Sequence, residues 1–200
     1  MAERPIIFGT WAIPKLLDGS KTQTRRTRGL EKINKNPDEW VQPYQLDVDP
    51  QLWTWRSTKT GEVITIKCPY GQVGDKLWVR ETWFPFKGMA GDRIVYKADN
   101  DIQPEHPMCW QPSIHMFRRD SRIDLTITEI GAERLWEITE GDAIAEGCQV
   151  VSGQVTPCGD AVVFVSARYM FRSLWVSLNA KRYPWSFNPW EWPITFELVK

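Results

Sequence analysis

The sequence predicts an α+β domain built on a mostly antiparallel, barrel-like β-sheet. Short runs rich in β-branched and aromatic residues predict strands, three helical patterns lie far apart along the chain, and no regular helical crossovers separate the strands. Two hundred residues can bury about two-thirds of the surface that an unfolded chain exposes. We therefore expect a single domain over residues 1–200 that needs no metal or disulfide to fold.

The N-terminal elements are a short buried strand over residues 5–8 and a helix over residues 11–18. Ile13, Leu16 and Leu17 are expected on the apolar face of this helix, and Gly19 ends it. The next expected elements lie beyond a polar stretch that carries several prolines and tryptophans.

We interpret this stretch, residues 29–61, as an insertion or long excursion. Its tryptophans could serve a function, but we favour an ordinary surface loop in which Trp40, Trp53 and Trp55 cover the core. Tryptophan is usually largely buried, which supports the second interpretation.

The remaining elements follow from alternation, turn residues and helical spacing. Strands are expected over residues 62–67, 76–83, 93–98, 122–130 and 192–199, with a turn at 70–75. Alternation places Arg80 and Glu81 on opposite faces of their strand, so one of them can point into a pocket. Helices are expected over 138–146 and over 167–178.

The helix at 138–146 has local signals at both ends. Thr139 and Asp142 have the spacing of a capping box, and Gly147 is a stop. The last helix shows apolar residues three and four apart, namely Ala167, Met170, Phe171, Leu174, Trp175 and Leu178.

Charge and hydropathy exclude several classes of protein. Lys plus Arg and Asp plus Glu each number 25, which excludes a histone-like basic protein and an acidic disordered tail. No apolar run approaches the length of a membrane span. The N-terminal residues contain no signal-peptide segment, so we expect a cytoplasmic protein without a membrane partner.

The cysteines and histidines show no metal-ligand spacing, and we expect no cofactor and no metal. They are Cys68, Cys109, Cys148 and Cys158, with His106 and His115. Without a partner in any triad arrangement, His115 is expected to be structural or to contact a ligand.

The densest polar cluster is the segment 19–28, which holds Lys21, Arg25, Arg26 and Arg28 among three threonines. Arginines suit bidentate contacts to phosphates or base edges, whereas a solvated basic loop is the simpler interpretation. Both interpretations stay open on the sequence.

The same segment resembles the ASCH domain, a relative of the PUA domains that bind RNA. Gly19, Lys21, Thr24 and Arg26 match its first motif, and Gly74-Asp75 matches its second. The segments GSKTQTRR, CPYGQVGDKLWVRETW, QPSIHMFRRDSRI and WEITEGDAIAEG are similar to ASCH proteins of bacteriophages and prophages. The resemblance implies a PUA-like small β-barrel with flanking helices, and a bacterial host cell.

One branch of this family comprises amidohydrolases that remove the acetyl group from acetylated cytidine with a lysine, a threonine and a glutamate. Lys21, Thr24 and Glu146 match these three residues. Most relatives have glutamate where Thr24 stands, so threonine favours the hydrolase-like branch. Those hydrolases are much shorter than this chain, and the excursion at 29–61 could reshape the cleft.

Chemistry allows this assignment under two conditions. A threonine hydroxyl needs a base to take its proton, and an amine is a base only when it is neutral. Neighbouring cations such as Arg25 could lower the pKa of Lys21, and Glu146 could protonate the leaving amine. The segment must also bend, because a straight strand puts Lys21 and Thr24 on opposite faces. A salt bridge of Lys21 with Glu81 or Asp75 would instead make it structural.

A second patch interleaves aromatic and cationic residues over 110–122. Trp110, His115, Arg118 and Arg119 could stack a base and hold phosphates. Equally, this segment could be a strand of the barrel whose arginines face solvent.

We expect recognition of a nucleoside or of RNA-type nucleic acid in a cleft lined by Lys21, Thr24, Arg26, Glu81 and Glu146. The partner could be a free nucleoside, single-stranded or structured RNA, or DNA, with amidohydrolase activity on acylated cytidine as the enzymatic possibility. The alternatives are a non-catalytic RNA- or DNA-binding module and a phage accessory protein that binds another protein.

Overall fold

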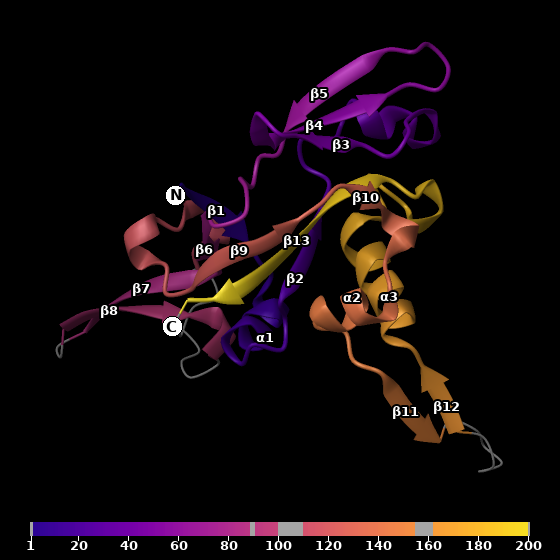
Figure 1. Cartoon of the computed structure of the whole chain (residues 1–200). Helices are drawn as coiled ribbons and strands as arrows, with labels where there is room; N and C mark the ends of the chain where they lie inside the picture. Colours follow the sequence, from indigo (N-terminus) through magenta and orange to yellow (C-terminus); the bar gives the residue numbers. More distant parts are fainter. Residues whose placement is uncertain (1, 89–90, 100–109, 155–161, 200) are drawn as a thin grey trace.

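The computed structural model describes residues 2–88, 91–99, 110–154 and 162–199. The expectations for Cys109, Cys158 and His106 lie outside these residues. The fold is α+β with mostly antiparallel strands, as the sequence predicts (Figure 1). Its main sheet contains β1 (Glu3–Ile7), β2 (Gln23–Arg26), β6 (Lys76–Arg80), β9 (Asp124–Ile130), β10 (Glu133–Arg134) and β13 (Trp190–Leu198).

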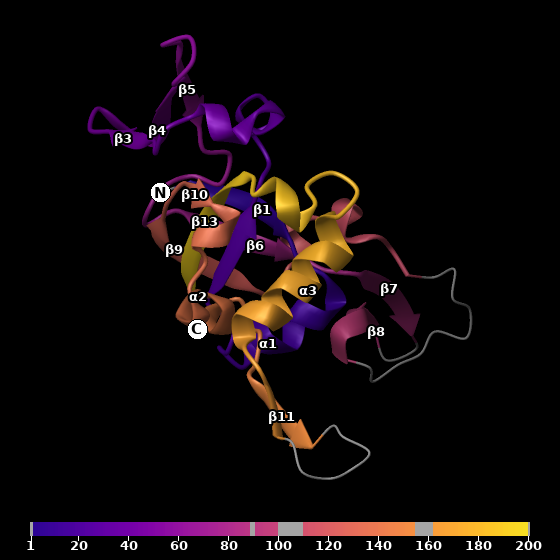
Figure 2. The same ribbon diagram turned by 90° about the vertical axis from the view of Figure 1, so that its right-hand side faces the viewer.

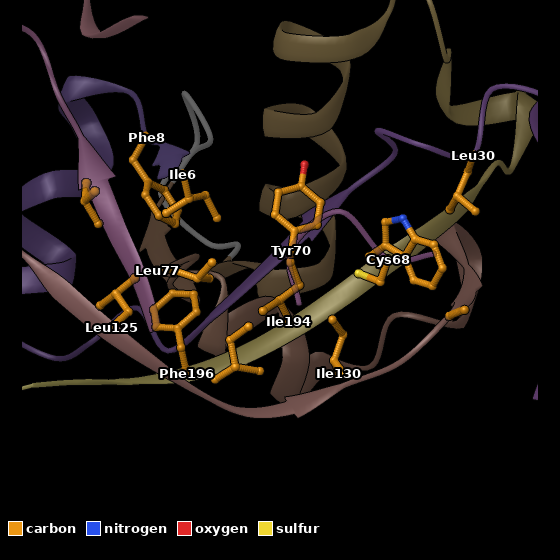
Figure 3. Packing of buried hydrophobic residues seen from close by; sticks show 14 of the residues in the cluster. Ile6, Phe8, Leu30, Cys68, Tyr70, Leu77, Leu125, Ile130, Ile194 and Phe196 are labelled. Atoms are coloured by element: carbon orange, nitrogen blue, oxygen red, sulfur yellow. The ribbon is translucent and has the colours of Figure 1, made fainter. Parts of the chain in front are cut away.

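The long strand β13 is the centre of this sheet. Its Ile194 pairs with Thr24 of β2 on one side and with Ile130 of β9 on the other. Beyond β9 the sheet continues through β6 to β1, and only the β1–β6 pair is parallel. The core lies on this sheet, where Leu77, Leu125 and Ile194 are almost fully buried (Figure 3).

The expected closure into a barrel is not observed in the described part of the chain. The edge strands β1 and β2 share no backbone ladder, and a side chain joins them instead, because Arg26 Nη2 donates to the Ile7 carbonyl over 2.7 Å. Aromatic and polar side chains converge at this gap.

The segment 29–61 is more ordered than a loop. It contributes two short 3-10 helices (Ile33–Lys35 and Pro37–Glu39), β3 (Tyr44–Leu46) and β4 (Asp49–Arg56). In a separate antiparallel sheet, β4 pairs with β3 on one side and with β5 (Val63–Lys67) on the other. The sheet projects from the top of Figure 1. The predicted burial of its tryptophans is confirmed, and Trp55 packs edge-to-face on Trp190 and Trp192 of β13. This tryptophan contact attaches the excursion to the core.

Three helices and two hairpins complete the fold. The helices are α1 (Ile13–Leu17), α2 (Glu140–Ala145) and α3 (Ala167–Asn179), and the predicted capping box of α2 is present. The two-stranded sheets are β7 (Trp83–Gly88) with β8 (Gly91–Tyr96), and β11 (Val151–Gln154) with β12 (Val162–Val165). Figure 2 looks onto α3, with α1 and the main sheet behind it. None of the helices in the described ranges is long and apolar enough to cross a membrane.

Replacing Trp55 by alanine tests whether the excursion belongs to the core. We expect Trp55→Ala to lower the free energy of unfolding by about 3–5 kcal/mol, because the indole is fully buried against β13. Val48→Ala is the control, since Val48 lies in the same excursion and is 90% exposed. Its effect should stay within about 0.5 kcal/mol in urea denaturation. Equal effects of the two substitutions would contradict the packing.

Candidate functional site

A cavity of about 370 Å³ lies at the gap between β1 and β2. Its lining comes from five places in the chain: the end of β1 with the segment after it, the segment 21–28, the turn at Tyr70, the end of α2, and one face of α3. Lys21, Thr24 and Glu146 all contribute to the lining. The structure therefore brings together the three residues that the sequence assigned to catalysis.

Backbone hydrogen bonds hold the segment before β2 against two helices. The Lys21 amide donates to the Lys15 carbonyl of α1, and the Thr22 amide donates to the Ala145 carbonyl of α2, both over 2.8 Å. Lys15 Nζ also donates to the Gly147 carbonyl over 2.5 Å. Because of these contacts, Lys21 sits beside the C-terminal end of α2.

The ammonium of Lys21 is enclosed by oxygen atoms. Its Nζ donates to the Gln23 carbonyl (2.8 Å), the Glu146 carbonyl (2.8 Å) and Glu146 Oε2 (2.5 Å). The rings of Phe8 and Trp11 lie 5.8 and 5.7 Å from the same nitrogen. Burial lowers the pKa of Lys21, and the ion pair with Glu146 opposes that shift. The salt bridge thus forms with Glu146 rather than with Glu81 or Asp75.

Of the two carboxylate oxygens of Glu146, one accepts a hydrogen bond within the described part of the chain. The side chain is 5% exposed, and its Oε2 accepts from Lys21. The other oxygen, Oε1, is buried and has no hydrogen-bond partner among the described residues. Buried carboxylate oxygens are costly to leave unpaired, so Oε1 is a site where a bound ligand or water would be stabilised.

Thr24 lies in a strand that the sequence analysis missed. Lys21 precedes this strand, which begins at Gln23. Thr24 is 4% exposed and lines the cavity from β2. The three hydrogen bonds of Lys21 Nζ go to Gln23 and Glu146, and none goes to Thr24.

Arg25 is unavailable to a substrate phosphate. Its guanidinium makes ion pairs with Glu191 (2.6 Å), Glu133 (2.6 Å) and Asp142 (3.4 Å), and its side chain is 1% exposed. Burial raises the pKa of Glu191, and Arg25 acts against that rise. The expected substrate contact of Arg25 is replaced by a structural one that ties β2 to β10, α2 and β13.

Two other arginines of the cluster face the cavity. Arg26 lies 4.9 Å from the Phe8 ring, and Arg28, which is exposed, lines the cavity with it. Of the predicted cations in 21–28, these two are the ones placed to meet an anionic ligand.

A second hollow of about 390 Å³ contains His115 together with Arg80, Trp83 and Phe117. Its Arg80 pairs with Ile7 of the first cavity in the β1–β6 ladder. Arg119 lies over the Phe117 ring at 5.2 Å, and its side chain is 82% exposed.

The other predicted binding residues have different surroundings. Trp110 packs edge-on against Phe84, and Arg118 bonds Glu3 and Asp124 over 2.9 Å. Glu81 does not line the cavity; it is buried and bound by Arg122 at 2.9 and 3.1 Å. The expected contribution of Glu81 to the cleft is therefore wrong, because Arg122, from the segment before β9, already neutralises it.

Sequence reasoning missed the aromatic part of the lining. Phe8, Trp11, Tyr70, Phe171 and Trp175 surround the cavity. Figure 3 shows Tyr70 between the Phe8 side of the core and the Leu30 side. The helical spacing predicts that Phe171 and Trp175 share a face of α3. It does not predict that this face lines the same cavity as Phe8, because the two segments are far apart in the sequence.

The described residues contain no group of three or more His, Cys, Asp or Glu side chains that could hold a metal ion. Comparison of the chain with models of protein families, with curated proteins and with solved structures gives no match. The site must therefore be interpreted from its own geometry.

Replacing Gly147 by alanine tests how closely the end of α2 packs against Lys21. Its φ is +86°, and an added Cβ would lie 3.0 Å from Lys15 Cδ and 3.4 Å from Lys21 Cβ. Gly19 is the matched control, because its φ is +78° with nothing within 4 Å. Alanine should cost about 1–2 kcal/mol at both positions through the left-handed backbone. We expect a larger loss at Gly147 in urea denaturation, and equal losses would contradict the close contact.

Proposed function

We propose that this cavity binds an acylated cytidine and that the protein is an ASCH-type, PUA-like amidohydrolase which releases the acyl group. The observation that carries the proposal is the convergence of Lys21, Thr24 and Glu146 on one cavity. Thr24 and Glu146 come from separate elements, β2 and the end of α2, and no local pattern requires them to meet.

The cavity suits a nucleoside in size and in lining. Its volume lies within the range of about 300–1,000 Å³ that is typical of small-molecule sites. Aromatic rings from Phe8, Trp11 and Tyr70 offer faces or edges to a base, and base–aromatic stacking contributes about 1–3 kcal/mol per base. Arg26 and Arg28 at the opening would meet a sugar or phosphate oxygen.

The chemistry is nucleophilic acyl transfer. Thr24 Oγ1 attacks the acyl carbonyl carbon, the carbon–nitrogen bond breaks, and the cytidine amine departs with a proton. Water then hydrolyses the threonine ester and restores the hydroxyl. The buried Lys21–Glu146 pair acts as the general base and general acid of both steps.

Replacing Thr24 tests the enzymatic proposal directly. Wild-type protein should release acetate from N4-acetylcytidine, and Thr24→Ala should reduce kcat/KM by about 10²-fold or more because the nucleophile is lost. Thr22→Ala is the control, since Thr22 does not line the cavity. Product is measured by chromatographic separation of cytidine. Retained turnover in Thr24→Ala, or the absence of turnover in the wild type, would overturn the hydrolase proposal.

A second candidate function is the binding of a nucleic-acid strand without catalysis. The second hollow favours it, because the exposed Phe117 and Arg119 form a stacked aromatic–cation pair beside a cavity that can hold a base. The pairing of Ile7 with Arg80 links the linings of the two hollows, which would let one strand contact both.

Phe117→Ala tests this candidate with Tyr44→Ala as control, since both side chains are about equally exposed aromatics, at 60% and 59%. If a strand binds, Phe117→Ala should weaken binding of a short single-stranded RNA by about fivefold or more, as loss of one stacking contact predicts. Fluorescence anisotropy at two salt concentrations measures the affinity. Unchanged binding in Phe117→Ala, or equal weakening in the control, would exclude a stacking role for this hollow.

A further inference from the structure

The geometry points to Glu146 Oε1, rather than Lys21 Nζ, as the group that takes the proton of Thr24, with Lys21 a permanent ammonium that positions Glu146. This inference rests on the proposed hydrolase function. It changes the assignment that the sequence suggested, in which Lys21 was the base and Glu146 only the acid.

The contacts of Lys21 Nζ support the ammonium form. An ammonium has three N–H donors, and Nζ faces three oxygen acceptors within 2.8 Å. A neutral amine has two N–H groups and a lone pair. Inside this cage the lone pair would face an oxygen, and one buried acceptor would lose its partner. The three oxygen contacts of Lys21 Nζ therefore oppose its base form, against the burial that lowers its pKa.

The contacts of Glu146 support the opposite role. Lys21 holds Oε2 and the backbone carbonyl of the same residue, which fixes the side chain from two directions. Oε1 is left buried, without a partner among the described residues, in a side chain that lines the cavity with Thr24. Oε1 makes no hydrogen bond to Thr24 in the unliganded cavity, and catalytic hydrogen bonds commonly form only once the substrate is bound, so this free acceptor is suited to receive the Thr24 proton at that stage.

One carboxyl group then serves both steps, and the protons balance. As the Thr24 Oγ1–carbon bond forms, the hydroxyl proton moves to Glu146 Oε1 and the carbonyl π electrons move to the carbonyl oxygen. When the carbon–nitrogen bond breaks, the same proton passes to the departing amine. In the second step Glu146 takes a proton from water as the water oxygen bonds the ester carbon, and returns it to Thr24 Oγ1. Lys21 neither gains nor loses a proton.

Three variants separate the two assignments. Arginine stays charged and cannot act as a base, but it can bond a carboxylate. We expect Lys21→Arg to keep more than one-tenth of the wild-type kcat on N4-acetylcytidine, whereas Lys21→Met and Glu146→Gln should each lose about 10²-fold or more. If Lys21 is the base, Lys21→Arg should be as inactive as Lys21→Met.

A second measurement does not depend on how well arginine fits. The charge of Lys21 in wild-type protein is measured by NMR of ¹⁵N-labelled lysine at pH 7, with the Lys21 signal assigned by its loss in Lys21→Met. An ammonium signal supports the inference, and a neutral amine overturns it whatever the variants do. Wild-type protein that releases no acetate overturns the proposed function and the proton step together. Active wild type with a neutral Lys21 overturns the inference alone.

Discussion

The buried ion pair between Lys21 and Glu146 is the contact on which the candidate site depends. It joins the segment before β2 to the end of α2, and both side chains are at most 5% exposed. Removing one partner of such a pair typically costs about 3–5 kcal/mol, because the other charge stays buried without compensation. The pair therefore fixes the position of Glu146 at the same time as it orders the segment that leads to Thr24.

The Lys21–Glu146 pair lies at the open edge of the main sheet. Because β1 and β2 share no ladder, the space between them is filled by side chains, and the cavity remains where they do not meet. The network around Arg25 holds β2 itself, with carboxylates from β10, α2 and β13. Together the two charge clusters fix β2 and the segment that precedes it.

Folding neutralises part of the positive charge that is concentrated in the segment 21–28. The segment 21–28 is strongly cationic in sequence, yet Lys21 and Arg25 are neutralised by internal carboxylates. What remains for a ligand is Arg26, Arg28 and the aromatic lining. The net charge of zero thus includes specific buried ion pairs, and two of the four cations in the segment 21–28 serve the fold.

The sequence by itself determined what local forces control. Thr139 and Asp142 cap α2, Gly147 ends it, and the spacing of Phe171 and Trp175 creates the apolar face of α3, because capping and periodicity act within a few residues. Only the tertiary structure decided that Gln23–Arg26 is a strand, since four polar residues give no strand pattern and their stability comes from β13 and from distant carboxylates. The same holds for the partner of Lys21. A buried charge is paired with whichever carboxylate the fold brings near, and chain distance carries no information about that choice.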